Sequence, residues 1–198
     1  MDSDLAESVT TLKDIFARRN IRATFGKAEA PVIDQLKKTL KVPQRFRAFL
    51  VAADPQDVET VTPVERVRLF SAEKILTEQT GPGPLDTAGN PHPGWRKSWV
   101  IIGRSALLGD PYFLDVSKLD AEGDCPVFTT MTGTDTLKPT LCASSFAQFL
   151  RILATAMEVA TGFGNGVMDD EDESIFRETL GPKIKTIDSA ALRAGHWN

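Results

Sequence analysis

The sequence has 198 residues, of which 41% are hydrophobic and 25% are charged, and its formal net charge at pH 7 is −4. These values are typical of a soluble globular protein with one sizeable domain, or one domain with an extension. The acidic balance argues against sequence-independent nucleic-acid binding, which needs clustered cations, but it is compatible with a basic protein partner. No stretch approaches the roughly 20 apolar residues of a membrane span, and the N-terminus carries acids where a secretory signal carries bases. We therefore expect a cytoplasmic protein with no membrane and no nucleic-acid partner.

The first 60 residues carry signals for three helices. Asp4 with Glu7 three residues later forms a capping-box pattern, and apolar residues then repeat at helical spacing. A short extended piece is expected around Thr24–Phe25, and a second helix from Pro31, which suits a first-turn position. The stretch "VPQRFRAFL" predicts a third helix that begins at Pro43.

Strand signals dominate the middle of the chain. "VRLF" predicts a strand, and Ser71 after it can cap a short helix that runs through Gln79. Residues 80–94 hold four prolines and four glycines, so a long surface loop is expected there. Three further strands are predicted by "SWVIIG", "PYFLDVS" and "PVFTTMTG", the first as a continuous apolar run and the second by alternation.

The last third predicts helices. Ser145 with Gln148 opens a long amphipathic helix that Gly162 ends. An acidic run at 169–173 precedes apolar positions, as at a helix N-terminus, and the remaining tail is a docked or frayed extension. Helices, then strands, then a helix indicate an α+β fold. We predict a domain over residues 1–162 and a C-terminal extension over 163–198.

The two cysteines, Cys125 and Cys142, are too few for a disulfide scaffold. In a reducing compartment two free thiols are expected. A pair between them stays open, because both lie in the same predicted sheet-and-helix region.

Motifs for nucleotide, metal and histidine chemistry are weak. "GFGNG" at Gly162 lacks the Rossmann spacing and follows a helix, so a helix end and turn explains it better. The run 169–173 lacks the alternating ligands of a calcium-binding loop. His92 and His196 have no metal-site or triad context, so a metal site has no support.

In "GDPYFLDVS" the carboxylate of Asp110 precedes the predicted strand, and that of Asp115 lies within it. If they approach one another around the turn, they form a pair of the kind that hydrolyses glycosides. The favoured interpretation is structural or binding: Asp110 before Pro111 is an ordinary turn residue, and Asp115 accepts hydrogen bonds or pairs with an arginine such as Arg104.

Five motifs in order carry a family resemblance. They are "VPQRFRAFL" (42–50), "VRLFSAEKIL" (67–76), "WVIIGRSALLGDPYFLDVS" (99–117), "CPVFTTMTG" (125–133) and "SSFAQFL" (144–150). Together they resemble the SMI1/KNR4, or SUKH, superfamily over about residues 30–155. The sequence departs from the family pattern at "AADPQD" (52–57), in the long loop 80–94 and in the tail after 162.

The resemblance implies a mixed, mostly antiparallel sheet flanked by helices, and a role without catalysis or cofactor. Bacterial members look mainly like immunity proteins that bind and neutralise toxins, and fungal members look like regulatory scaffolds. We therefore expect an immunity protein that binds a cognate toxin domain, with an intracellular scaffold or, less favoured, a nucleotide- or sugar-processing enzyme as alternatives. The oligomeric state stays open.

Candidate residues follow from these expectations. Amphipathic aromatics near loops and acidic side chains are the types suited to a basic protein surface. The candidate partner-binding residues are Trp95, Asp110, Tyr112, Asp169, Asp170 and Glu171. Trp99 and Asp115 are expected to be structural.

Overall fold

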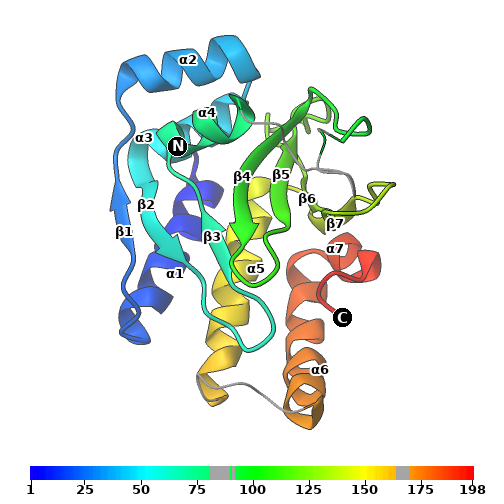
Figure 1. The fold of residues 1–198 in the computed structure, drawn as a ribbon. Helices are drawn as coiled ribbons and strands as arrows, with labels where there is room; N and C mark the ends of the chain where they lie inside the picture. Colours follow the sequence, from blue (N-terminus) through cyan, green and yellow to red (C-terminus); the bar gives the residue numbers. More distant parts are fainter. Residues whose placement is uncertain (81–89, 91, 164–169) are drawn as a thin grey trace.

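The computed structural model describes residues 1–80, 90, 92–163 and 170–198. Seven strands in this part of the chain form one sheet, and their order across the sheet is their order along the chain (Figure 1). The strands are β1 (Thr24–Gly26), β2 (Asp54–Glu59), β3 (Val67–Leu69), β4 (Trp99–Ser105), β5 (Pro111–Asp115), β6 (Val127–Thr129) and β7 (Thr140–Ala143). Each neighbouring pair is antiparallel. The predicted α+β fold is confirmed. The sheet was expected to be mixed and mostly antiparallel, and all neighbouring pairs among its described strands are antiparallel.

Helices cover the back and the ends of this sheet. They are α1 (Ser3–Arg18), α2 (Ala30–Leu40), α3 (Gln44–Ala53), α4 (Ala72–Thr80), α5 (Phe146–Val159), α6 (Asp170–Ile187) and α7 (Ser189–Ala194), with a short 3-10 turn at Ala160–Gly162. Figure 1 shows α1 and α5 behind the sheet, and these two helices pack against one another. Helix α6 packs on α5, and α7 packs on β7. Among the described residues, no helix combines the length and the apolar character that crossing a bilayer requires.

Most predicted elements form where the local signals place them. Ser145 caps α5 by accepting a hydrogen bond from the Gln148 amide, and Ser71 accepts one from the Lys74 amide at the start of α4. One cap is wrong: Asp2, not Asp4, accepts the Leu5 amide of α1. Two strands, β2 and β7, were not predicted from the sequence. β2 is rich in acids and contains a proline, and β7 has only four residues, so neither shows a strand pattern.

The C-terminal extension is docked rather than frayed. Phe176, Leu180 and Ile184 of α6 are buried, as is Trp197 near the chain end. The indole Nε1 of Trp197 donates to the carbonyl of Cys142 in β7 at 2.9 Å. The last residues are therefore tied to the edge of the sheet.

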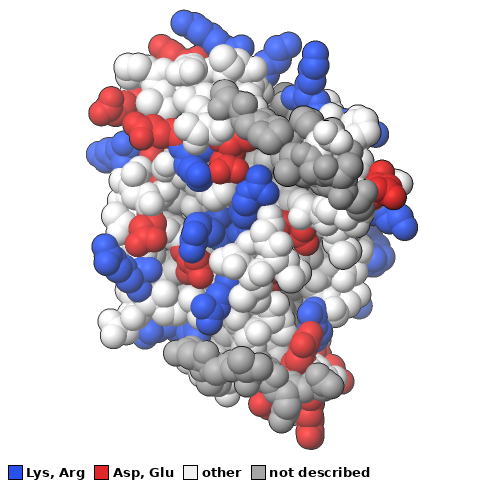
Figure 2. All heavy atoms as spheres, in the orientation of Figure 1, with Lys and Arg blue, Asp and Glu red and all other residues white. Residues whose placement is uncertain are grey.

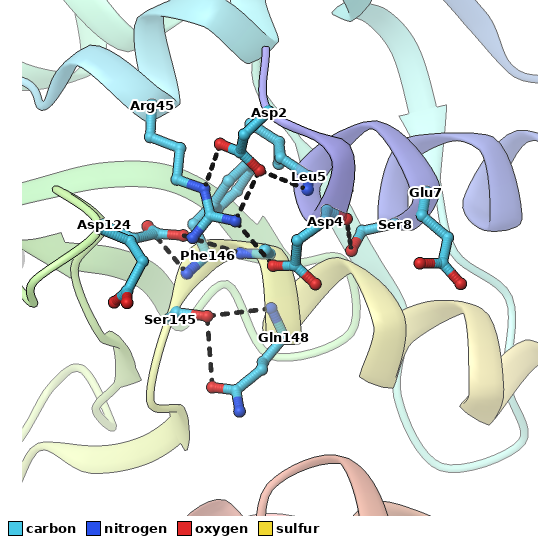
Figure 3. A network of polar contacts seen from close by, with 12 residues as sticks. Asp2, Asp4, Leu5, Glu7, Ser8, Arg45, Asp124, Ser145, Phe146 and Gln148 are labelled. Atoms are coloured by element: carbon cyan, nitrogen blue, oxygen red, sulfur yellow. Dashed lines mark hydrogen bonds and ion pairs between the residues drawn. The ribbon is translucent and has the colours of Figure 1, made fainter.

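A buried polar network joins the two halves of the fold at the start of α5 (Figure 3). The Arg45 guanidinium of α3 binds Asp2 and Asp4 at distances of 2.7 to 2.9 Å, and Asp124 at 3.3 Å. The completely buried Asp124 also accepts hydrogen bonds from the amides of Phe146 and Ala147 in the first turn of α5. These bonds satisfy amides that have no partner within the helix. Because the contacts come from four separate segments, the network fixes the N-terminus, α3, the loop before β6 and α5 relative to one another.

Candidate partner-binding site

A large hollow lies at one end of the sheet, where β3, β5 and β7 begin and β4 and β6 end. Its volume is about 820 Å³. The strands and their loops form most of its wall, and the C-terminal residues 194–196 close one side. Its lining includes Glu65, Leu108, Asp110, Thr129, Thr130, Met131, Lys138 and His196. The hollow thus depends on the docked C-terminal extension.

Three exposed hydrophobic side chains lie in the loops at this end of the sheet. Leu107 and Leu108 lie in the turn between β4 and β5, and Met131 follows β6. Their exposed fractions are 57%, 73% and 68%. Leu108 and Met131 line the hollow itself. We call these three residues the apolar rim. Contiguous exposed apolar side chains beside polar ones are typical of protein interaction sites.

Hydrogen bonds hold the loops of the apolar rim in place. Oδ1 of Asp110 accepts from the amide and the hydroxyl of Thr132, at 2.8 and 3.1 Å, and so joins the turn before β5 to the loop after β6. The amide of Ala106 donates to the carbonyl of Arg66 at 2.7 Å, which joins the same turn to the loop before β3. The rim is therefore presented by loops that are fixed to one another, which lowers the entropy cost of binding.

Two polar residues of the lining, Glu65 and His196, lie beside the completely buried Tyr112. The Tyr112 hydroxyl lies 3.0 Å from Nε2 of His196. Burial raises the pKa of Glu65, and the charge of Asp110 acts in the same direction, against hydrogen bonds from Ser105 and the Arg66 amide. Burial lowers the pKa of His196 to about 4. Near neutral pH the imidazole is therefore uncharged.

One hydroxyl at the hollow is unsatisfied. Thr130 is 2% exposed, yet its Oγ1 finds no hydrogen-bond partner among the residues that the structure describes. A buried hydroxyl without a partner costs about 1–3 kcal/mol. Thr130 lines the hollow, so a molecule that enters it can supply the missing hydrogen bond.

The low pKa of His196 predicts a pH-dependent stability. Because the unfolded chain takes up a proton near pH 6.5 and the folded chain only near pH 4, stability falls as pH falls through this window. The loss between pH 8 and pH 5 amounts to about 2 kcal/mol from this residue. His196→Gln keeps a hydrogen-bonding group beside Tyr112 but does not titrate. We expect the free energy of unfolding in urea to fall by about 2 kcal/mol less for the variant than for the wild type between pH 8 and pH 5. If the two proteins lose the same free energy over this range, the assignment to His196 is wrong.

The other predicted aromatics lie at the opposite end of the sheet. Trp95 is partly buried, and its ring centroid lies 5.2 Å from that of Trp99 and 5.0 Å from that of Phe113. Asp115 ends β5 and is 2% exposed; its Oδ1 accepts from the amide and the hydroxyl of Ser117. A smaller hollow of about 440 Å³ is lined there by Trp99 and Asp115 among others. Trp95 and Asp110 therefore do not share one surface.

The structure contradicts one sequence-based prediction, that of Tyr112 as a surface contact, and it excludes the disfavoured pairing of Asp110 with Asp115. Tyr112 is completely buried against Phe149, with ring centroids 5.6 Å apart, so it is not a surface contact. Asp110 and Asp115 do not approach one another. They sit at the two ends of β5, and five residue steps of an extended strand separate them by roughly 17 Å. The carboxylate pairs of glycosidases are about 5 to 10 Å apart.

Both cysteines are free and buried. Burial raises the pKa of each thiol well above its ordinary value. A thiol in such a site stays protonated at neutral pH, and the thiolate is the reactive form. The geometry therefore does not prepare either cysteine as a nucleophile. Across the described part of the chain, no three His, Cys, Asp or Glu side chains are grouped as metal ligands.

Three acidic candidates, Asp169, Asp170 and Glu171, belong to the C-terminal extension and are far in sequence from the apolar rim. The structure describes only part of this segment. Asp169 and glycines 164 and 166 of "GFGNG" lie outside the described residues, Asp170 begins α6, and Glu171 is exposed. Figure 2 shows acidic side chains gathered at the bottom, over the first turns of α6, whereas cations and acids are mixed over the strands. This face of the protein is not uniformly acidic.

Neither the apolar rim nor Glu65 and Thr130 was predicted from the sequence. A usable signal existed for the rim. In "RSALLGD" two leucines occupy a turn between strands, where polar residues are the rule. Nothing local marks Glu65 or Thr130, whose position at the hollow follows from strand order. No family model matches the sequence, and no curated protein matches it either.

Proposed function

We propose that this protein is a non-catalytic, cytoplasmic immunity protein that neutralises a cognate bacterial toxin by direct binding. The motif order that resembles the SMI1/KNR4 superfamily motivates the toxin as partner. The observation that carries the binding role is the apolar rim, because the two most exposed large hydrophobic side chains in the described residues, Leu108 and Met131, line the same hollow.

The rim has the features of a binding surface rather than of scattered exposure. The other large hydrophobics exposed in the described residues, Met1, Val51, Leu119 and Ile175, belong to separate segments. Single exposed apolar residues are normal on a protein surface, whereas a group beside a hollow provides buried area for a few anchors that carry most of the binding energy.

The test requires the candidate toxin: a secreted protein with a C-terminal toxin domain that we expect to be encoded beside this gene. We expect the purified protein to bind the C-terminal toxin domain with one-to-one stoichiometry and to protect cells that express it. Leu108→Asp places a charge in the apolar rim and should weaken the complex at least about tenfold, as loss of an interface anchor does. Calorimetry and a growth assay measure the two effects.

Leu119→Asp is the matched control. Leu119 is 58% exposed, like the rim residues, but it follows Asp115 at the opposite end of the sheet. We expect this variant to bind at full strength. If neither binding nor protection is found for the wild type, and housekeeping proteins are captured instead, the chain is a regulatory scaffold and the proposal is wrong.

A further inference from the structure

The hollow beside the apolar rim combines acceptors for hydrogen bonds with an excess of acidic groups. Its wall carries the carboxylates of Glu65 and Asp110 and the hydroxyl of Thr130, which is buried and has no partner among the described residues. Lys138 is the one cationic side chain in the described lining, and His196 is neutral near pH 7. The lining is therefore acidic by one charge when both carboxyls are ionised.

From this arrangement we propose that the hollow receives an arginine side chain of the protein partner, which donates hydrogen bonds to Glu65, Asp110 and Thr130. A guanidinium has five donors in a fixed plane and no acceptor, so a wall of acceptors suits it. This inference rests on the proposed function, because it takes the occupant from a protein that covers the apolar rim.

The apolar rim favours an arginine of a protein over a free small cation. Leu108 and Met131 line the mouth and are more than two thirds exposed. The aliphatic stem of an arginine packs on such side chains while its head reaches the polar base. A macromolecule that carries this arginine also covers Leu107 and excludes water around the ion pairs, as in an interface hot spot.

The carboxylates are held ready by their own hydrogen bonds. Oε1 of Glu65 accepts from the Ser105 hydroxyl at 2.9 Å and from the Arg66 amide at 2.8 Å. Oδ1 of Asp110 accepts from Thr132. A cation that enters the hollow meets groups whose orientation is already fixed, so little side-chain entropy is lost on binding.

A probe of the hollow alone does not depend on the toxin. We would titrate the full chain, labelled with ¹⁵N, with N-acetylarginine methylamide and, separately, with the matching citrulline compound, which has the same shape but a neutral head. We expect saturable shifts of the amide signals of Thr130, Met131 and Gly195 with arginine and none with citrulline. Equal shifts for both compounds, or no saturable shift with arginine, would overturn the inference.

Conservative variants test the same point in the complex. Glu65→Gln and Asp110→Asn keep the acceptor oxygens used within the fold but remove the charge, and each should weaken binding of the toxin domain about tenfold or more. Thr130→Val removes only the hydroxyl. We expect it to leave the urea midpoint of the free protein unchanged or raised, because the hydroxyl has no partner to lose, and to weaken the complex several-fold.

The outcomes separate the two proposals. If the Leu108→Asp change weakens the complex while the Glu65, Asp110 and Thr130 variants bind at full strength, the arginine inference is wrong and the binding function stands. If the toxin domain does not bind the wild type, the proposed function is wrong, and the titration with arginine and citrulline still decides what the hollow accepts.

Discussion

Replacing Asp124 with alanine should lower the free energy of unfolding by about 3–5 kcal/mol, the usual cost of removing one partner from a buried charge pair. Asp124 is completely buried and faces the Arg45 guanidinium at 3.3 Å. Its carboxylate also accepts from the amides of Cys125, Phe146 and Ala147. The alanine variant leaves three buried amides and part of a buried cation without their acceptor.

The surrounding charges limit how the protein can compensate. Arg45 keeps its bonds to Asp2 and Asp4, so the cation does not become completely unpaired. Within the described residues, the amides of Phe146 and Ala147 bond only to the Asp124 carboxylate and have no second carboxylate as acceptor. We therefore expect the larger part of the loss to come from the positive end of α5, where a carboxylate is favoured by the helix dipole.

Two controls make the measurement specific. Glu122→Ala removes an exposed acid from the same loop and should change the urea-derived stability by no more than about 0.5 kcal/mol. In a double-mutant cycle, Asp124→Ala should cost less in an Arg45→Met background, because that background holds no buried cation. Equal costs in both backgrounds would show that the ion pair contributes nothing.

Elements with local sequence signals were predicted correctly. Features that depend on contacts between segments far apart in the sequence were not. Ser145 and Ser71 cap helices through bonds to the residue three positions later, so their patterns are readable. The capping-box pattern of Asp4 with Glu7 is also local, yet it predicted the wrong cap for α1. The choice of Asp2 goes together with Arg45, which is 43 residues away from it and binds both carboxylates.

The same distinction explains the candidate site. Tyrosine is a residue type that is common at interfaces. However, β5 is an interior strand of a seven-stranded sheet, and the Tyr112 ring packs on Phe149 of α5, so Tyr112 is buried. Conversely, Glu65, Thr130 and His196 lie far apart in the sequence. They meet because β3, β5 and β7 all begin at one end of an antiparallel sheet and the chain end returns to that place. Strand order of this kind is not written in any local pattern.

Trp197→Ala should lower the free energy of unfolding by about 3 kcal/mol, as truncation of a buried aromatic side chain does. Its indole is 5% exposed, donates to the Cys142 carbonyl and packs on His196 with ring centroids 4.5 Å apart. Asn198→Ala, at the exposed neighbouring position, is the control and should leave the urea midpoint unchanged.

We also expect Trp197→Ala to open the wall of the hollow that the C-terminal residues form. Asp188 accepts hydrogen bonds from Ser144 and from the Ala190 and Ala191 amides, so α7 should remain on β7. The loss then concentrates on residues 195–198, which include the wall residue His196. Once this imidazole is released into water, its pKa returns toward 6.5 and the pH dependence assigned to it disappears. If Trp197→Ala retains the full pH dependence of the wild type, His196 is still buried and the indole does not hold the C-terminal wall in place.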